Sequence, residues 1–183
     1  MSESILLSIR PEWVEKILNG EKTIEVRKRF PKDYVGWVYI YCSKATKSNE
    51  RLLGNHKDNY RYHTTNDHID FYSDYMLRNI VNGKVVARFW CDKVEEITTE
   101  KWSPSKEQDL LKASCLTENQ LFDYCNLESG KPFYAIHISK LEIFDRPKYL
   151  NEYYKTYIET EKGIYYQVLT KAPQNYCYIE GEE

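Results

Sequence analysis

Residues 22–29 concentrate side chains that could bind or react with a ligand. From Thr23 onwards the apolar residues recur with a period of two, which predicts a strand with Ile24 and Val26 on one face. The opposite face then carries a hydroxyl, a carboxylate and two guanidinium groups, those of Thr23, Glu25, Arg27 and Arg29. Lys22 directly precedes this strand, so the segment predicts a compact polar cluster at one strand end.

The side chains of this cluster favour binding of a ligand over catalysis. A carboxylate at Glu25 can accept a hydrogen bond from the exocyclic amine of a base, as carboxylates do with cytosine. A guanidinium at Arg27 can fork onto phosphate or stack on a base. A partly desolvated Lys22 can position an anion or act as a base. The alternatives are a structural ion-pair network and a surface lysine beside a helix C-terminus.

Short elements are expected to position the cluster. Residues 5–9 form an apolar strand, and Pro11 suits the first position of the following helix. Its apolar face carries Trp13, and Asn19-Gly20 supplies the stop just before Lys22. Further strands are expected at 37–42, 85–94, 134–144 and 174–180, and helices at 104–113 and 118–126 after Ser103 and Thr117.

The remaining segments are less regular. Residues 44–82 are polar and are interpreted as an insertion or long loop, with a weak helical run at 73–80. Residues 148–171 are rich in tyrosine and lysine and lean towards helix. Five or six strands with interleaved short helices predict one domain over residues 1–183, of the α+β class, built as a small mixed β-barrel with short flanking helices.

Four blocks of the sequence resemble the ASCH domain family, which belongs to the PUA-like β-barrels. Gly20-Glu21-Lys22-Thr23-Ile24-Glu25-Val26-Arg27 looks like the Gly-x-Lys-x-x-Glu-x-Arg signature of that family. The flanking residues 6–11 and 28–31 resemble its prophage-type and bacterial members. Residues 82–87, 137–141 and 172–178 resemble later strands of the same subfamily, so the resemblance spans most of the chain.

The resemblance implies a cleft where the first helix meets the signature strand, and binding of RNA or a modified nucleobase in connection with transcription or translation. One branch of the family hydrolyses N4-acetylcytidine with a lysine matching Lys22 and a threonine three residues later. That position holds Glu25 here. If the chain is an enzyme, we expect Lys22 and Glu25 to be catalytic, with Glu25 activating water. An amidohydrolase is therefore the first alternative, and a ribonuclease ranks below it.

Three more residues are candidates for contact with a nucleic acid or nucleoside. Tyr41 shares a strand face with Tyr39 and offers a stacking ring. His137 alternates with the apolar residues of its strand, so it faces either the cleft or the interior. Gln174 could hydrogen-bond to a base edge or tie the last strand to the rest of the fold. The histidines at 56, 63 and 68 match no zinc-site spacing, so no metal or other cofactor is expected.

Composition sets the outer limits. A net charge of −2 conceals a basic first part, with 12 Lys/Arg against 8 Asp/Glu in residues 1–65. Five cysteines without a Cys-x-x-Cys pair argue against a disulfide framework and favour reduced thiols in the cytoplasm. No apolar run reaches the roughly 20 residues that span a bilayer. A regulatory protein with a protein partner stays open as the second alternative, and the sequence does not fix an oligomeric state.

Overall fold

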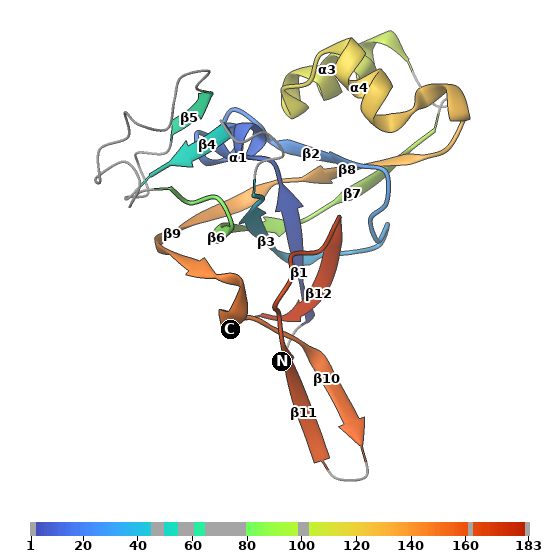
Figure 1. The fold of residues 1–183 in the computed structure, drawn as a ribbon. Coiled ribbons are helices and arrows are strands. Elements are labelled where there is room, and N and C mark those ends of the chain that lie inside the picture. Colours follow the sequence, from blue (N-terminus) through green and yellow to red (C-terminus); the bar gives the residue numbers. More distant parts are fainter. Residues whose placement is uncertain are drawn as a thin grey trace.

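The computed structural model describes residues 3–44, 50–54, 61–64, 80–98, 103–160 and 163–181. Its strands form two main sheets, with helices at one end and a separate hairpin at the other (Figure 1). Within the described residues, no helix is both long enough and apolar enough to span a bilayer.

The larger sheet has five strands in the order β12, β1, β3, β6 and β9. Their bounds are Tyr176–Glu180, Glu3–Ile9, Gly36–Cys42, Lys84–Cys91 and Ser139–Tyr149. β1 and β3 run parallel, and the other pairs are antiparallel. β1 and β3 are apolar on both faces because both faces are covered.

The smaller sheet holds the signature strand at its edge. Its order is β2, β8 and β7, with bounds Ile24–Arg27, Phe133–His137 and Val94–Ile97. Helices α3 (Pro104–Ser114) and α4 (Glu118–Cys125) cover one face, where Val26 and Phe133 pack against Leu110 and Leu121. Ser103 and Thr117 cap these helices, as the sequence predicts.

Helix α1 (Pro11–Leu18) packs on the larger sheet through Val14 and Ile17, both fully buried. Pro11 occupies the first turn, and the helix ends at Asn19. Gly20 follows with φ +74°, a left-handed conformation that glycine adopts without a Cβ penalty. This turn delivers the chain into β2.

The opposite face of the larger sheet has its own apolar cluster, built around Leu6, Tyr39 and Tyr41. Tyr153 and Leu169 close over this cluster from the base of the hairpin. Tyr41 is 4% exposed, so its ring is a core element there.

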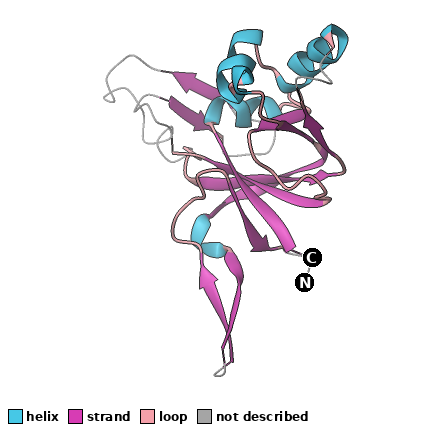
Figure 2. Cartoon of the chain, turned by 90° about the vertical axis from the view of Figure 1, so that its right-hand side faces the viewer, coloured by secondary structure: helices cyan, strands magenta, loops and turns pink. Residues whose placement is uncertain are grey.

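The prediction of helix at 148–171 is wrong. A single 3-10 turn, η4 (Leu150–Glu152), leads into strands β10 (Tyr154–Thr160) and β11 (Gly163–Val168), which pair as an antiparallel hairpin. The hairpin projects away from both sheets (Figures 1 and 2). Tyrosine and β-branched residues suit a pleated surface better than a helix, and this composition outweighs the helical leaning of the lysines.

The other boundaries need smaller changes. The expected strands 85–94 and 134–144 each divide in two, giving β6 with β7 and β8 with β9. The insertion contains the paired strands β4 (Glu50–Leu53) and β5 (Arg61–Thr64), and a short 3-10 turn, η3 (Leu127–Ser129), follows α4. The helical run expected at 73–80 lies outside the described residues, except for Ile80, which bridges to Leu53.

The α+β class with short flanking helices is confirmed. The strands are shared between a twisted five-stranded sheet and a three-stranded sheet, so the described ladder is open rather than closed into a continuous barrel. The seam between the two sheets is where the polar cluster lies.

Candidate functional site

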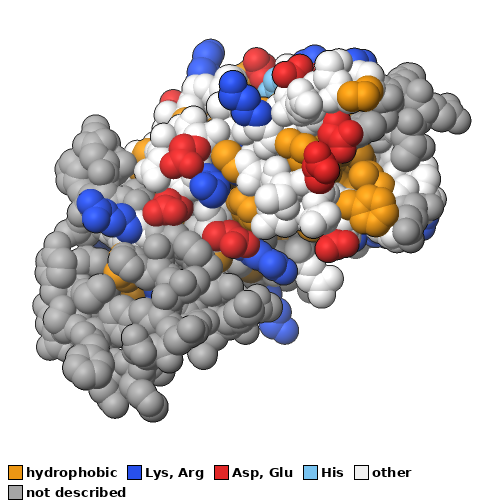
Figure 3. Space-filling model, turned by 90° about the horizontal axis from the view of Figure 1, so that it is seen from above, with side chains coloured by type: hydrophobic (Ala, Val, Ile, Leu, Met, Phe, Trp, Pro, Cys, Tyr) orange, Lys and Arg blue, Asp and Glu red, His pale blue; other side chains and the backbone are white. Residues whose placement is uncertain are grey.

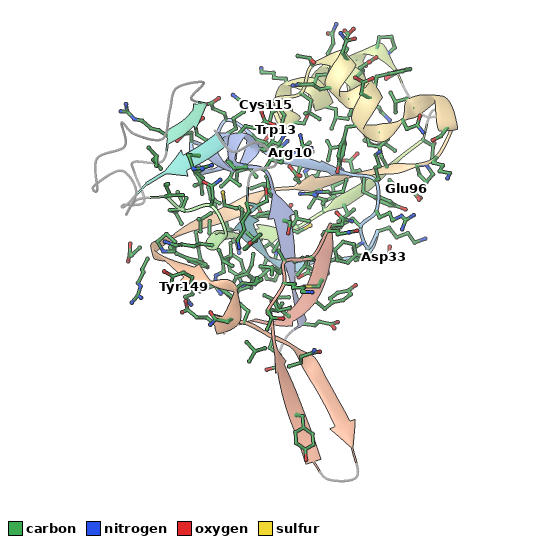
Figure 4. The ribbon with its side chains drawn as sticks, in the orientation of Figure 1. Arg10, Trp13, Asp33, Glu96, Cys115 and Tyr149 are labelled. Carbon is green, nitrogen blue, oxygen red and sulfur yellow. The ribbon has the colours of Figure 1, made fainter. Side chains whose placement is uncertain are left out.

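A cavity of about 700 Å³ opens between the two sheets and is bounded by β1, α1, β2 and α4. Four of the predicted residues line it, namely Lys22, Glu25, Arg27 and Gln174. Figure 4 labels Arg10 and Trp13 at the start of α1, close to Cys115 at the end of α3. The cleft implied by the first helix and the signature strand is therefore present.

Lys22 is fixed by the C-terminal end of α3. Its Nζ donates a hydrogen bond of 2.6 Å to the carbonyl oxygen of Ser114, and the adjacent Thr23 amide donates to Ala113 at 2.8 Å. Carbonyl groups in the last turn of a helix lack intrahelical partners and carry partial negative charge, so a cation is favourable there. The sequence alternative of a lysine beside a helix C-terminus thus applies to Lys22, but the helix is α3 rather than α1.

Glu25 joins the two cations. One carboxylate oxygen, Oε2, lies 3.3 Å from Lys22 Nζ, and the other, Oε1, lies 2.9 Å from Arg27 Nε. The three side chains are 2%, 7% and 9% exposed for Lys22, Glu25 and Arg27 respectively. The sequence left open whether these residues form a ligand-binding cluster or an ion-pair network. In the structure they form an ion-pair network that also lines the cavity.

Arg27 is held from several directions. Its terminal nitrogens donate to the Ser8 carbonyl oxygen at 2.6 Å and to Asn175 Oδ1 at 3.4 Å. Its Nε–H makes no aligned hydrogen bond, although Glu25 is within ion-pair distance. Because a guanidinium has five N–H donors, Arg27 keeps donor capacity for a ligand.

The electrostatics of the cavity favour an electron-rich ligand. Its lining carries five cations against three carboxylates, namely Arg10, Lys22, Arg27, Lys28 and Lys44 against Glu12, Glu25 and Asp123. Burying charges is costly unless they are paired, and the Lys22–Glu25–Arg27 cluster keeps one positive charge in excess. The end of the molecule that carries the helices mixes both signs of charge on its outer surface (Figure 3).

Two aromatic rings form part of the cavity wall. Lys22 Nζ lies 5.4 Å from the ring centre of Trp13, and Lys28 Nζ lies 5.4 Å from that of Tyr124. Desolvation raises the pKa of the Tyr124 hydroxyl, and Glu25 adds to the rise, while the charge of Arg27 and a hydrogen bond from it act in the opposite direction. Rings held beside cations offer a base a stacking surface.

Four predicted residues lie away from the cavity. Thr23 is exposed and bonds through its backbone to Ala113 and Ile138. β2 ends at Arg27, so Arg29 leaves the strand and lines a neighbouring groove. Tyr41 belongs to the apolar cluster on the far face of the larger sheet.

His137 is the fourth. Its Nε2 lies 3.0 Å from Glu95 Oε1, and Glu95 also pairs with Lys93. These three residues form a small polar cluster on β7 and β8, outside the cavity lining. Of the two orientations that the sequence leaves open, the structure thus places His137 outside the cleft.

Several cavity residues escape sequence reasoning. Ser114 contributes only a backbone carbonyl, for which no side-chain signal exists. Gln120 and Tyr124 lie four residues apart on α4, so a shared helical face was readable, but not the strand that this face covers. Asn175 follows Gln174 and shares its two sequence alternatives, contact with a base edge or a structural tie; its Oδ1 accepts from Arg27 and its Nδ2 donates to the Arg29 carbonyl at 2.8 Å.

The hydroxyl groups in the cavity lining belong to Ser8, Ser43 and Tyr124. The nucleophile expected of an acyl-enzyme route is a hydroxyl near Lys22, and Thr23 is outside the lining. The hydroxyl of Ser8 donates to the Pro173 carbonyl at 2.7 Å. Among the described residues, no group of three His, Cys, Asp or Glu could hold a metal ion; His56 and His68 lie outside those residues.

Comparison with solved structures identifies similar folds. The ASCH protein from Zymomonas mobilis is 16% identical, with a TM-score of 0.52 over 81% of this chain and 75% of that one. A serine-to-alanine variant of it gives a TM-score of 0.58 at 15% identity, over 97% of this chain and 88% of that one. A tyrosine-to-phenylalanine variant gives 0.52 at 15% identity, over 81% and 77%.

Comparison with family models and with curated protein sequences gives no match. The structural similarity therefore confirms the ASCH-type fold that the four sequence blocks suggest, at an identity that speaks for the fold alone.

Proposed function

We propose that this chain, whose fold is that of ASCH domain proteins, binds a nucleobase in its cavity, either within RNA or as a modified nucleoside. The observation that carries the proposal is the buried Lys22–Glu25–Arg27 cluster at the wall of a cavity large enough for a nucleoside. Three charged side chains at most 9% exposed cost stability in a purely structural role, where apolar residues of similar volume often serve as well.

Glu25 is the residue that reads the base. Each of its oxygens has one cationic neighbour, and an ionised carboxylate has about four acceptor positions. The remaining positions suit the exocyclic amine of cytosine or adenine, and a well-placed polar pair of this kind discriminates between bases by about 1–3 kcal/mol.

Arg27 and the aromatic wall complete the site. The donors that Arg27 retains suit a base carbonyl or a phosphate oxygen. Trp13 and Tyr124 offer faces on which a base stacks, at about 1–3 kcal/mol per base. The excess of cations in the lining attracts the ligand from solution.

Calorimetric titration with the 5′-monophosphates of adenosine, cytidine, guanosine and uridine, and with N4-acetylcytidine, tests the proposal. We expect at least one to bind, and Glu25→Gln to weaken that binding about tenfold or more. Tyr124→Ala is a second variant, because Tyr124 is 40% exposed and tolerates truncation better than the buried cluster. Lys106→Ala, an exposed position on α3 outside the cavity lining, is the charge control.

The proposal fails if none of the five compounds binds, or if neither Glu25→Gln nor Tyr124→Ala changes their affinity while both variants remain folded by circular dichroism. Chromatography of the N4-acetylcytidine sample addresses the hydrolase alternative in the same experiment. Release of cytidine that Lys22→Ala abolishes would establish an amidohydrolase in place of a binding module.

A further inference from the structure

A second hollow of about 290 Å³ adjoins the cavity. We call it the basic groove, and its lining combines three cations with three aromatic rings, namely Lys28, Arg29 and Lys131 with Phe30, Tyr134 and Tyr176. No carboxylate belongs to this lining among the described residues, although the Tyr134 hydroxyl donates to Glu96 at 3.1 Å. Figure 4 labels Glu96, which lies near the first residues of β8, at the end of that strand away from the larger sheet.

The cations of the basic groove are accessible. Lys28, Arg29 and Lys131 are exposed, and neither Arg29 nor Lys131 has a carboxylate partner among the described residues. The aromatic side is fixed instead, since Tyr176 packs 5.5 Å from the ring centre of the buried Phe30. A rigid aromatic side facing unpaired cations is the composition of a single-stranded nucleic acid channel.

Two chain segments run from the cavity into the basic groove. In the first, Arg27 lines the cavity, Lys28 lines both hollows and Arg29 lines the groove. In the second, residues 174–176, Gln174 lines the cavity and Tyr176 lines the groove.

Asn175 ties these segments together. Its side chain accepts from Arg27 at 3.4 Å and donates to the Arg29 carbonyl at 2.8 Å. Cavity and groove are therefore consecutive parts of one surface that share Lys28.

We propose that the basic groove holds the phosphodiester and the neighbouring base of a single-stranded RNA whose other base occupies the cavity. This inference rests on the proposed function and narrows its ligand to a strand of at least two nucleotides. Arg29 and Lys131 contact phosphate, Tyr176 stacks the second base, and Lys28 contacts the strand where it passes between the two hollows. A free nucleoside engages only the cavity and lacks these contacts.

The test compares two probes on the same variants. The first is the mononucleotide or nucleoside that binds the cavity, and the second is a fluorescein-labelled RNA heptamer containing that base, followed by anisotropy between 50 and 300 mM KCl. We expect the Arg29→Ala/Lys131→Ala double variant to weaken heptamer binding about tenfold and leave the mononucleotide unchanged. Alanine at 29 retains the backbone oxygen that Asn175 binds, so folding is preserved.

Salt dependence gives a second readout. Each neutralised phosphate contributes about −0.7 to the slope of log K against log salt for a single strand, so losing the phosphodiester contact makes the slope shallower by about 0.7. Tyr176→Leu, which keeps an apolar group against Phe30, should weaken the heptamer by about fivefold with the slope unchanged. Lys106→Ala is again the control for an exposed cation elsewhere.

The inference is overturned if the heptamer binds no tighter than the mononucleotide, or if the double variant leaves both its affinity and its salt slope intact. These results differ from failure of the proposed function, in which the wild-type protein binds neither probe. If the double variant weakens mononucleotide and heptamer binding by the same factor, the inference is also contradicted. The substitutions would then affect the cavity itself rather than contacts made only by the longer strand.

Discussion

Two of the guanidinium–carboxylate pairs in the described part of the chain lie in contrasting surroundings. Arg27 and Glu25 face the cavity with side chains 9% and 7% exposed, whereas Arg88 and Glu142 lie on the larger sheet with side chains 18% and 48% exposed. Arg88 also stacks on Trp37, 4.3 Å from the ring centre, and donates to the Tyr39 hydroxyl at 3.1 Å. The same two functional groups thus line a cavity in one place and a packed surface in the other.

The two pairs differ in how much hydrogen-bonding capacity the fold leaves unused. The guanidinium of Arg88 is covered by rings that belong to the fold, so little of it is left for a ligand. The cluster at Arg27 keeps donors and acceptors directed at an open volume, and it adds a second cation, Lys22, to one carboxylate. Burial combined with remaining hydrogen-bonding capacity is the signal, rather than charge alone.

Removing the shared carboxylate should have the largest effect on stability. Glu25→Ala leaves Lys22 and Arg27 buried without their anion, and breaking a buried ion pair in this way costs about 3–5 kcal/mol. Urea denaturation followed by circular dichroism measures the free energy of unfolding. A loss below about 1 kcal/mol would mean that water enters the cavity and screens the two cations.

Removing one cation should cost less. Lys22→Met keeps the length of the side chain but loses the hydrogen bond to the Ser114 carbonyl, and we expect a loss of about 1.5–3 kcal/mol. Lys16→Met is the matched control, because Lys16 pairs with Glu21 at 3.2 Å where the side chains are 36% and 54% exposed. Equal losses in the two variants would contradict the distinction between buried and exposed pairs.

The pair on the larger sheet should be nearly neutral. Glu142→Ala removes a half-exposed carboxylate, and exposed pairs contribute about 0–1 kcal/mol. Its urea midpoint should lie close to that of the wild type, with Arg88 still held by Trp37 and Tyr39. A loss of unfolding free energy as large as that of Glu25→Ala would show that the two ion pairs do not differ in their contribution to stability.

The smallest effect is expected at Glu95, which adds a dependence on pH. A hydrogen bond from Lys93 lowers the pKa of Glu95, and His137 lowers it further, against a rise from desolvation. A pKa below the unfolded value of about 4.3 means that Glu95 stabilises the fold above that pH and loses this contribution as the pH falls through its folded pKa.

The stability difference between wild type and Glu95→Gln should therefore be present at pH 6 and shrink towards pH 3. Its size should stay below about 1 kcal/mol, because the Glu95 side chain is 44% exposed. Thermal unfolding of both proteins across this range measures it. A difference that grows as the pH falls would have the wrong sign for a lowered pKa.

Local signals in the sequence predict the elements that carry the site. Pro11, the Asn19-Gly20 stop and the period of two from Thr23 place α1 and β2 correctly, because caps and alternation depend on neighbouring residues. The pairing of Glu25 with Arg27 follows from the same alternation. The basic stretch continues to Arg29, but the strand ends at Arg27, so Arg29 lines the basic groove instead of the cavity.

Contacts between distant segments are what the sequence does not reveal. The carbonyl that fixes Lys22 comes from residue 114, and the ring that closes the cavity comes from Tyr124. The alternation along its strand predicts which residues share a face with Tyr41, but not which face of the sheet borders the cavity. In the structure Tyr41 lies on the far face, where the hairpin base covers it.

The pairing of β1 with β12 has a consequence for the timing of protein synthesis. Leu7 lies opposite Tyr176, and the Ser8 amide donates to the carbonyl oxygen of Asn175, so the first strand completes its pairing only when residues 175–176 have been made. At about 5–20 residues per second, a ribosome needs roughly 10–35 s to make the intervening chain. Arg27 takes one partner from each of these segments, Ser8 and Asn175. In a nascent chain, the hydrogen-bond partners of Arg27 are therefore incomplete until translation has passed both segments.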